Sequence, residues 1–113
     1  MTHLMVLVLN KEEFLDDILA AFMEIGISGA TIIDSVGMGH ILAYDVPIFA
    51  GLRQMIHGQR PYNKTIFTVV RDEEMIKEAV RMVEKICSSL NEPGTGLIFT
   101  VPVDMVRGMA PEA

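Results

Sequence analysis

Several kinds of residue are scarce in this sequence of 113 residues. It has one cysteine, Cys87, no tryptophan, and 9 Lys and Arg against 15 Asp and Glu, which gives a formal net charge of −6 at pH 7. A single cysteine excludes a disulfide framework and a zinc knuckle within one chain. The acidic balance, with no basic run, argues against a general binder of nucleic acids or of anionic membranes.

Long hydrophobic runs are also missing. The most apolar long stretch, residues 25–43, is interrupted by Asp34, His40 and several glycines, so it is not expected to span a bilayer. Leu4–Leu9 is too short for a signal-peptide core and has no basic leader. Because half of the residues are hydrophobic, disorder is excluded. We expect one cytoplasmic domain over residues 1–113, without membrane insertion.

Periodicity predicts four strands and two long helices. Leu4–Leu9 is a continuous apolar run typical of a strand covered on both faces, and β-branched or apolar runs predict strands at Ala30–Val36, Thr65–Val70 and Leu97–Val103. Asn10 with Glu13 is an N-cap signature for a helix that ends at Gly26. Asp72 caps a second helix. The two apolar helix stripes are Phe14, Leu15, Ile18, Leu19, Phe22 and Ile25, then Ile76, Val80, Val83, Ile86 or Cys87, and Leu90.

This order of elements predicts an α+β fold, a ferredoxin-like βαββαβ sandwich in which two helices cover one face of an antiparallel sheet. Strands as apolar as Leu4–Leu9 and Thr65–Val70 have too many large side chains for the other face to remain in water. We therefore expect that face to be buried in an oligomer.

The connection between the second and third strands, Gly39–Asn63, is too long for a turn. Its middle, Ile48–Ile56, has apolar residues at helical spacing and predicts a short helix. Long insertions on a compact scaffold commonly carry function.

Four motifs in this order resemble those of the nitrogen-regulatory PII signal proteins. Residues 24–32 (EIGISGATI) followed by Val36-Gly37-Met38-Gly39 are similar to the family's "GI-[ST]-G-x-T-[VI] … GxG" signature. Val69-Val70 before Asp72 resembles "VV-x-D". Residues 94–99 (GTGLIF) resemble a changed "GDGKIF", and Pro102-Val103 resembles the end of the last strand.

The resemblance implies a homotrimer whose open sheet faces pack at the centre. It also implies that adenine nucleotides (ATP, ADP or AMP as effector) bind in clefts between subunits. A long T-loop, here the Gly39–Asn63 segment, would meet a regulated transporter or enzyme. The resemblance implies that the residues of this segment that contact the partner protein are Tyr44, Phe49 and Arg53.

The sequence departs from the family at several ligand positions. Leu97 stands where the family has the lysine of "GDGK", and Thr95 stands where it has the aspartate. Ile41 replaces a glutamine that helps to hold magnesium and 2-oxoglutarate. The tail retains Arg107 alone of the phosphate-binding arginines, and Tyr44 lacks the setting in which the family is uridylylated. These departures argue against 2-oxoglutarate sensing and uridylylation.

The candidate ligand site combines two glycine-rich turns with two cations. Its floor is Gly37, Met38 and Gly39, its anion loop is Gly94, Thr95 and Gly96, and its charge partners are Lys64 and Arg107. Glycines let backbone N–H groups converge on an anion, and arginine can grip a phosphate with two hydrogen bonds. Each turn also has a plain interpretation, since Gly94–Gly96 can be a helix C-cap and Gly37–Gly39 a strand exit.

The sequence favours a non-enzymatic PII-like signalling protein. His3, His40 and His57 have no metal-ligand spacing, so we predict no metal site within one subunit. The alternative is a structural or metal-responsive trimer like the CutA-type proteins, which share the fold without a nucleotide. An enzyme is disfavoured because no paired catalytic constellation is recognisable.

Overall fold

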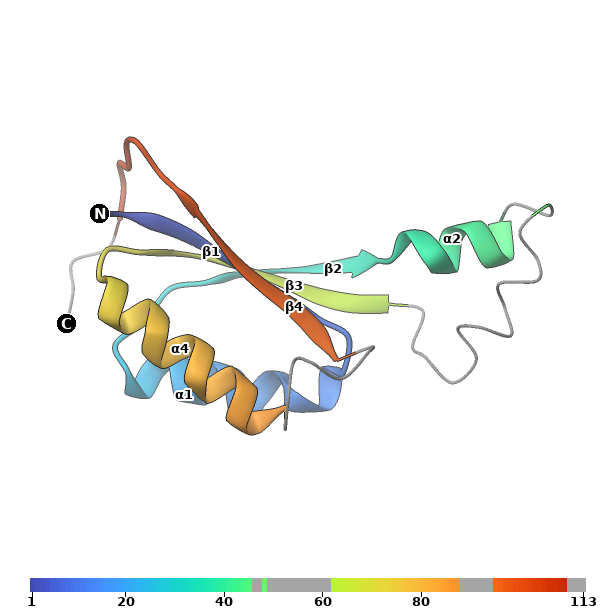
Figure 1. Ribbon diagram of the computed structural model, residues 1–113, viewed down its shortest axis with the longest axis horizontal. Helices are drawn as coiled ribbons and strands as arrows, with labels where there is room; N and C mark the ends of the chain where they lie inside the picture. The colour runs from blue at the N-terminus through green and yellow to red at the C-terminus, as the bar shows by residue number, and fades with distance from the viewer. Residues whose placement is uncertain (46–47, 49–61, 88–94, 110–113) are drawn as a thin grey trace.

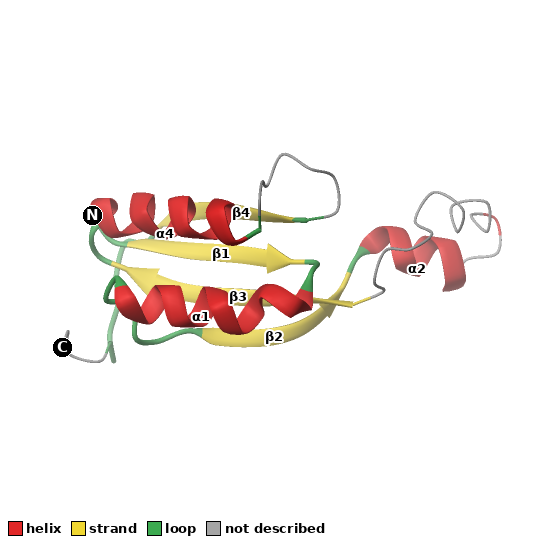
Figure 2. Cartoon of the chain, turned by 90° about the horizontal axis from the view of Figure 1, so that it is seen from below, coloured by secondary structure: helices red, strands yellow, loops and turns green. Residues whose placement is uncertain are grey.

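The fold is a four-stranded antiparallel sheet with two helices on one face. The structure is a computed structural model, and it describes residues 1–45, 48, 62–87 and 95–109. The strands lie in the order β2-β3-β1-β4, and α1 and α4 pack against the same face (Figures 1 and 2). The elements are β1 (His3–Leu9), the 3-10 turn η1 (Glu12–Phe14), α1 (Leu15–Glu24), β2 (Thr31–Val36), α2 (Met38–Asp45), β3 (Tyr62–Val70), α4 (Glu73–Ile86) and β4 (Gly96–Pro102). The predicted ferredoxin-like sandwich is confirmed.

The core lies between the helices and alternate residues of the central strand β1. Met5, Leu7 and Leu9 are buried, and Leu7 stands opposite Ile66 of β3 and Ile98 of β4. Since successive side chains of a strand point to opposite faces, these residues form one layer. The helices complete the core with Ile18, Phe22, Ala79, Val83 and Cys87.

The opposite face of the sheet is apolar and bears no helix among the described elements (Figure 2). Leu4, Val6 and Val8 of β1 are flanked on β4 by three large residues with substantial exposure. These are Leu97 at 58%, Phe99 at 43% and Val101 at 44%. We call this surface the open face. Large exposed apolar side chains are typical of a surface that another chain covers, and the sequence analysis expects this face to be buried in an oligomer.

The helix ends are partly as predicted. Gly26 follows α1 with φ of 100°, a left-handed conformation that suits glycine, and the backbone N–H of Glu74 donates to Asp72 Oδ1 at 2.9 Å. The predicted N-cap at Asn10 is wrong. The N–H of Asn10 donates to the Thr95 carbonyl oxygen at 3.1 Å, so the backbone of Asn10 continues the pairing of β1 with β4. Helical structure begins only after Lys11.

The structure also corrects the exit of the second strand. The chain enters α2 directly at Met38, and the N–H of Ile41 donates to the Gly37 carbonyl oxygen at 3.3 Å. Met38, Leu42 and Ala43 are good helix formers, and the helix continues through Gly39 despite the low helix propensity of glycine. The predicted short helix at Ile48–Ile56 lies outside the described residues, apart from Ile48. Within the described part of the chain, no helix is long and apolar enough to cross a membrane.

Gly96 is the glycine at which the sheet leaves least room. A Cβ atom there would lie 2.5 Å from the Val8 carbonyl oxygen, whereas a Cβ at Gly29 would meet nothing within 4 Å. Because backbone must move to accept it, we expect Gly96→Ala to lower the free energy of unfolding by about 1–3 kcal/mol. Urea denaturation measures the change, with Gly29→Ala as control. Equal effects of the two substitutions would contradict the tight pairing of β1 and β4.

Candidate functional site

Most of the predicted ligand residues meet at one end of the sheet, which we call the loop end. Asn10 connects its parts, because its N–H donates to the Thr95 carbonyl oxygen and its Oδ1 accepts from Asn63 Nδ2, each at 3.1 Å. Ser35, two residues before Gly37, donates to the Asn63 carbonyl oxygen at 3.3 Å. Thus the ends of β1 and β2 and the starts of β3 and β4 bring Gly37–Gly39 and Thr95-Gly96 to the same end.

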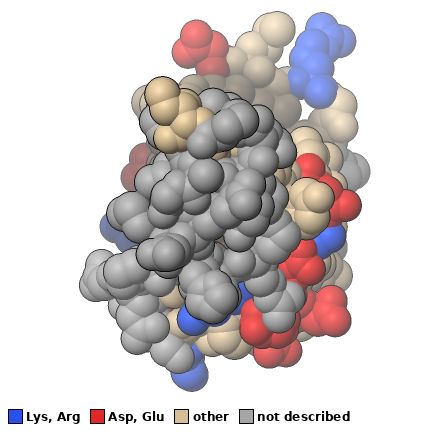
Figure 3. Space-filling view, turned by 90° about the vertical axis from the view of Figure 1, so that its right-hand side faces the viewer, with Lys and Arg blue, Asp and Glu red and all other residues tan. Residues whose placement is uncertain are grey.

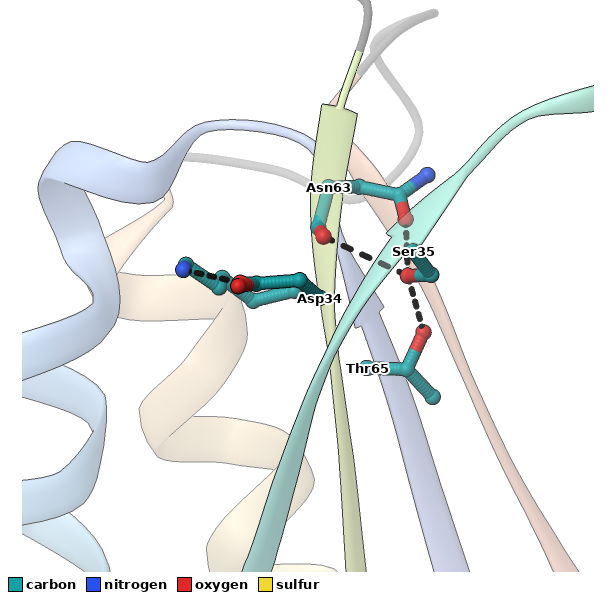
Figure 4. A network of polar contacts seen from close by, with 5 residues as sticks. Asp34, Ser35, Asn63 and Thr65 are labelled. Carbon is teal, nitrogen blue, oxygen red and sulfur yellow. Dashed lines mark hydrogen bonds and ion pairs between the residues drawn. The ribbon is translucent and has the colours of Figure 1, made fainter.

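A polar cluster lies on the open face at the loop end (Figure 4). Ser35 Oγ lies 2.7 Å from Thr65 Oγ1 and also donates to Asn63 Oδ1. These part-buried polar groups are hydrogen-bonded to one another at the point where β2 ends and β3 begins. Sequence reasoning missed the cluster. Its signal is a pair of polar residues at alternate positions, Asn63, which lies opposite Ser35, and Thr65, which lies diagonally across from it.

Asp34 points to the other, helix-covered side of the sheet (Figure 4), and it forms an ion pair there with Lys64, its partner in the register. The hydrogen bond that Lys64 Nζ donates to Asp34 Oδ1 raises the pKa of Lys64 above its ordinary value, and the nearby carboxylate of Glu12 adds to the effect. The predicted charge partner is therefore already engaged with a carboxylate. The Asp34 side chain is 77% exposed, so the pair stands at the surface, where solvent screens it.

The two glycine segments differ in their exposure to solvent. Met38 is 74% exposed, between the half-buried Gly37 and Gly39, so the start of α2 is open to solvent. Thr95 is fully buried, and its hydroxyl has no hydrogen-bond partner among the described residues. Gly94 lies outside the described residues. Whether these groups bind an anion stays a prediction.

Arg107 lies at the opposite end of the subunit from Gly37. It follows the C-terminal end of β4, and the antiparallel order makes this end the one remote from the C-terminal end of β2. Here the N–H of Val103 donates to the Thr2 carbonyl oxygen at 3.0 Å, and Arg71 Nε lies 3.2 Å from Met109 Sδ. One subunit thus does not bring Arg107 and the loop end together.

A hollow of about 460 Å³ opens at this Arg107 end, and we call it the tail hollow. Sequence reasoning did not identify it as a site. Its walls are residues 26–31 after α1, residues 67–71 of β3 and the following turn, Met75, Gly108 and Met109, together with Leu4. Thr68 fixes one wall because its hydroxyl donates to the Gly29 carbonyl oxygen at 2.6 Å. The glycine-rich stretch at residues 26–29 was the available signal.

The other candidates carry no site among the described residues. No group of three or more His, Cys, Asp and Glu is placed to hold a metal there. Cys87 is buried, and burial raises the pKa of its thiol, which does not suit a nucleophile. Phe49 and Arg53 lie outside the described residues, and Tyr44 is described only by its place in α2.

Comparison with known proteins places the chain in a family. The family model "Nitrogen regulatory protein P-II" matches residues 3–112, nearly the whole chain. The chain belongs to the P-II family. Proteins of this family are generally non-enzymatic regulators that form trimers and bind small ligands. The resemblance found in the glycine motifs is confirmed at the level of the family.

A solved P-II protein has the same fold. The chain is 18% identical to PII from Arabidopsis thaliana, in a crystal structure bound to citrate, with a TM-score of 0.62. The match covers 90% of this chain and 77% of the Arabidopsis chain. No curated protein sequence matches the chain significantly.

The polar cluster makes a prediction about stability. Ser35→Ala removes the hydroxyl that serves both Asn63 and Thr65, so we expect a loss of about 1–2 kcal/mol in the free energy of unfolding. Urea denaturation measures it. Ser28→Ala, at an exposed position in the loop after α1, is the control and should change the unfolding free energy by less than about 0.5 kcal/mol. A neutral Ser35→Ala would show that the cluster does not hold β2 and β3 together.

Proposed function

We propose that this member of the P-II family is a non-enzymatic regulator that binds an adenine nucleotide in clefts between the subunits of a homotrimer. The observation that carries the proposal is the separation of the site into two halves. The loop end holds Gly37–Gly39 and Thr95-Gly96, while Arg107 and the tail hollow lie at the far end of the same subunit. A cleft formed by the loop end of one subunit and the far end of its neighbour unites them.

The open face supports the trimer. Leu97, Phe99 and Val101 leave a broad apolar surface beside Val6 and Val8 of β1, and burying it against second copies removes that surface from water. A closed ring of identical subunits repeats the same junction between unlike ends of neighbouring subunits. Each junction of that kind gives one cleft, so three clefts are expected per trimer.

The nucleotide would use both halves. The exposed start of α2, Gly37-Met38-Gly39, offers an apolar floor for a base, and backbone N–H groups at Thr95 and Gly96 offer donors to phosphate. Gly94 completes this loop in the proposal, and Lys64 contributes to the extent that Asp34 releases it. Arg107 of the neighbouring subunit supplies a guanidinium that can bind a phosphate oxygen pair.

A ligand bound at the floor would contact the first residues of the inserted segment and could therefore change its orientation. Met38 and Gly39 are the first residues of α2, which extends beyond the sheet (Figure 1). A ligand that binds one orientation of this helix better than another shifts the population toward it. We propose that the segment Gly39–Asn63, with Tyr44, Phe49 and Arg53, contacts a regulated transporter or enzyme, and that the ligand controls this contact.

Arg107→Ala tests the cleft. Because a charge-assisted hydrogen bond is lost, we expect the dissociation constant of the tightest adenine nucleotide to rise by about tenfold or more, measured by isothermal titration calorimetry. Arg81→Ala is the control, since Arg81 pairs with Glu78 on α4 and its removal changes the net charge equally.

Two outcomes would contradict the proposal. Unchanged nucleotide affinity in Arg107→Ala would remove Arg107 from the cleft. Thermal stabilisation by a divalent metal ion, with none by AMP, ADP or ATP, would favour the metal-responsive trimer instead.

A further inference from the structure

The tail hollow has a charged side chain on its wall that the predicted site does not include. Among the described residues that line it, Arg71 alone is charged, and Phe67, Val69 and Met75 belong to its apolar wall. In a mostly apolar ligand site, a few placed polar groups fix how the ligand is oriented. A hollow of this kind suits a ligand with an apolar body and an anionic group.

Arg71 has no carboxylate partner in the part of the chain that the structure describes. The neighbouring carboxylate, Asp72, accepts the backbone N–H of Glu74 and caps α4. The contact found for Arg71 joins its Nε to Met109 Sδ at 3.2 Å. A thioether sulfur is a weak acceptor, and a guanidinium has several N–H donors. Most of the donors of Arg71 are therefore unused within the described residues.

An anionic oxygen is a better partner for Arg71 than the Met109 sulfur. Hydrogen bonds from a guanidinium to phosphate or carboxylate are charge-assisted and commonly bidentate. Arg71 is exposed at the end of β3, so its side chain can turn from Met109 to an anion in the hollow. This exchange replaces one weak neutral acceptor with a strong charged one.

A second guanidinium lies at the same end of the subunit. Arg107 precedes Gly108 and Met109, which line the hollow, and its Cα lies within about 7 Å of the Met109 Cα because two residues span no more. The loop end differs, since Lys11 there is followed by two glutamates and side chains of both signs surround the undescribed residues (Figure 3). The tail hollow therefore combines a wall without carboxylates with two nearby cations.

We propose that Arg71 is a further ligand-binding residue, which binds an anionic phosphate group of the ligand in the tail hollow, and that Met109 gives up its contact with Arg71 when the ligand binds. The inference rests on the proposed nucleotide site, to which it adds a second guanidinium beside Arg107. Because the C-terminal tail contains both Arg107 and Met109, its position is coupled to occupancy of the hollow.

NMR spectroscopy of the isotope-labelled protein observes both partners directly. The Nε–H resonance of Arg71 and the methyl resonance of Met109 are assigned by their loss in Arg71→Lys and Met109→Leu. Adenosine, AMP, ATP and inorganic pyrophosphate are added separately, without divalent metal ions. We expect AMP, ATP and pyrophosphate to shift both resonances, and adenosine, which has no phosphate group, to leave the Arg71 resonance in place. An equal shift with adenosine would overturn the phosphate contact.

Calorimetry measures what Arg71 contributes to affinity. We expect Arg71→Ala to raise the dissociation constant of ATP by about tenfold or more. Arg71→Lys should fall between wild type and Arg71→Ala, because lysine keeps the charge but loses the planar fork.

Arg81→Ala is the matched control for charge. It removes the same charge from α4, where Arg81 pairs with Glu78, so the dissociation constant should stay within about twofold of wild type. Equal effects of Arg71→Ala and Arg81→Ala would show that net charge alone sets the affinity, which would overturn the role of Arg71.

The failures of the two proposals are distinguishable. If nucleotides bind but the Arg71 resonance does not move, Arg71 is not a ligand residue while the nucleotide site stands. If pyrophosphate shifts the Arg71 resonance and no nucleotide binds, the anion contact stands and the nucleotide site is wrong. If the Arg71 resonance moves and that of Met109 does not, the release of the tail is overturned.

Discussion

Both faces of the central strand β1 are apolar, but in the part of the chain that the structure describes, helices cover only one of them, and the rest of the architecture follows from this constraint. Met5, Leu7 and Leu9 are buried beneath α1 and α4, while Leu4, Val6 and Val8 point to the open face. A contiguous apolar surface on the second face of a sheet commonly marks an interaction site. For this chain the cover is a second copy in our account, and that copy completes the ligand site.

The same sheet register decides which chemistry is available at the loop end. Opposed positions of β2 and β3 alternate between the two faces, so neighbouring residues have different roles. Ser35 and Asn63 join the polar cluster on the open face, whereas Asp34 and Lys64 pair on the other. A shift by one residue would exchange these roles, placing the ion pair in the subunit interface and the hydroxyls outside it.

Much of the fold could be predicted from the sequence because its signals are local. The continuous apolar run of β1, the cap at Asp72 and the left-handed Gly26 each depend on a few adjacent residues. Asn10 shows the limit, because its cap signature is genuine but the residue is held by Thr95 and Asn63, distant in sequence. The helix at Met38 was missed for a local reason, because the glycines on both sides of it favoured an exit turn.

The site was only partly predictable. Glycine motifs indicated the loop end, but the ion pair between Lys64 and Asp34 depends on a register that periodicity does not give. The tail hollow likewise forms where the residues after α1 meet β3 and the C-terminal tail, which are far apart in sequence. Resemblance to a family supplied the expected roles, whereas the charge balance around those roles is a property of this chain.

The most direct test of a shared cleft is complementation between two subunits that each lack one half of it. Arg107→Ala removes one half, and Gly37→Asp places a carboxylate in the other, where open space accepts the side chain. The two variants are refolded together in equal amounts, and AMP sites are counted by titration. Random mixing should restore about a quarter of the wild-type sites, because mixed trimers each contain one intact cleft. A mixture that binds no more AMP than the separate variants would show that the site does not lie between subunits.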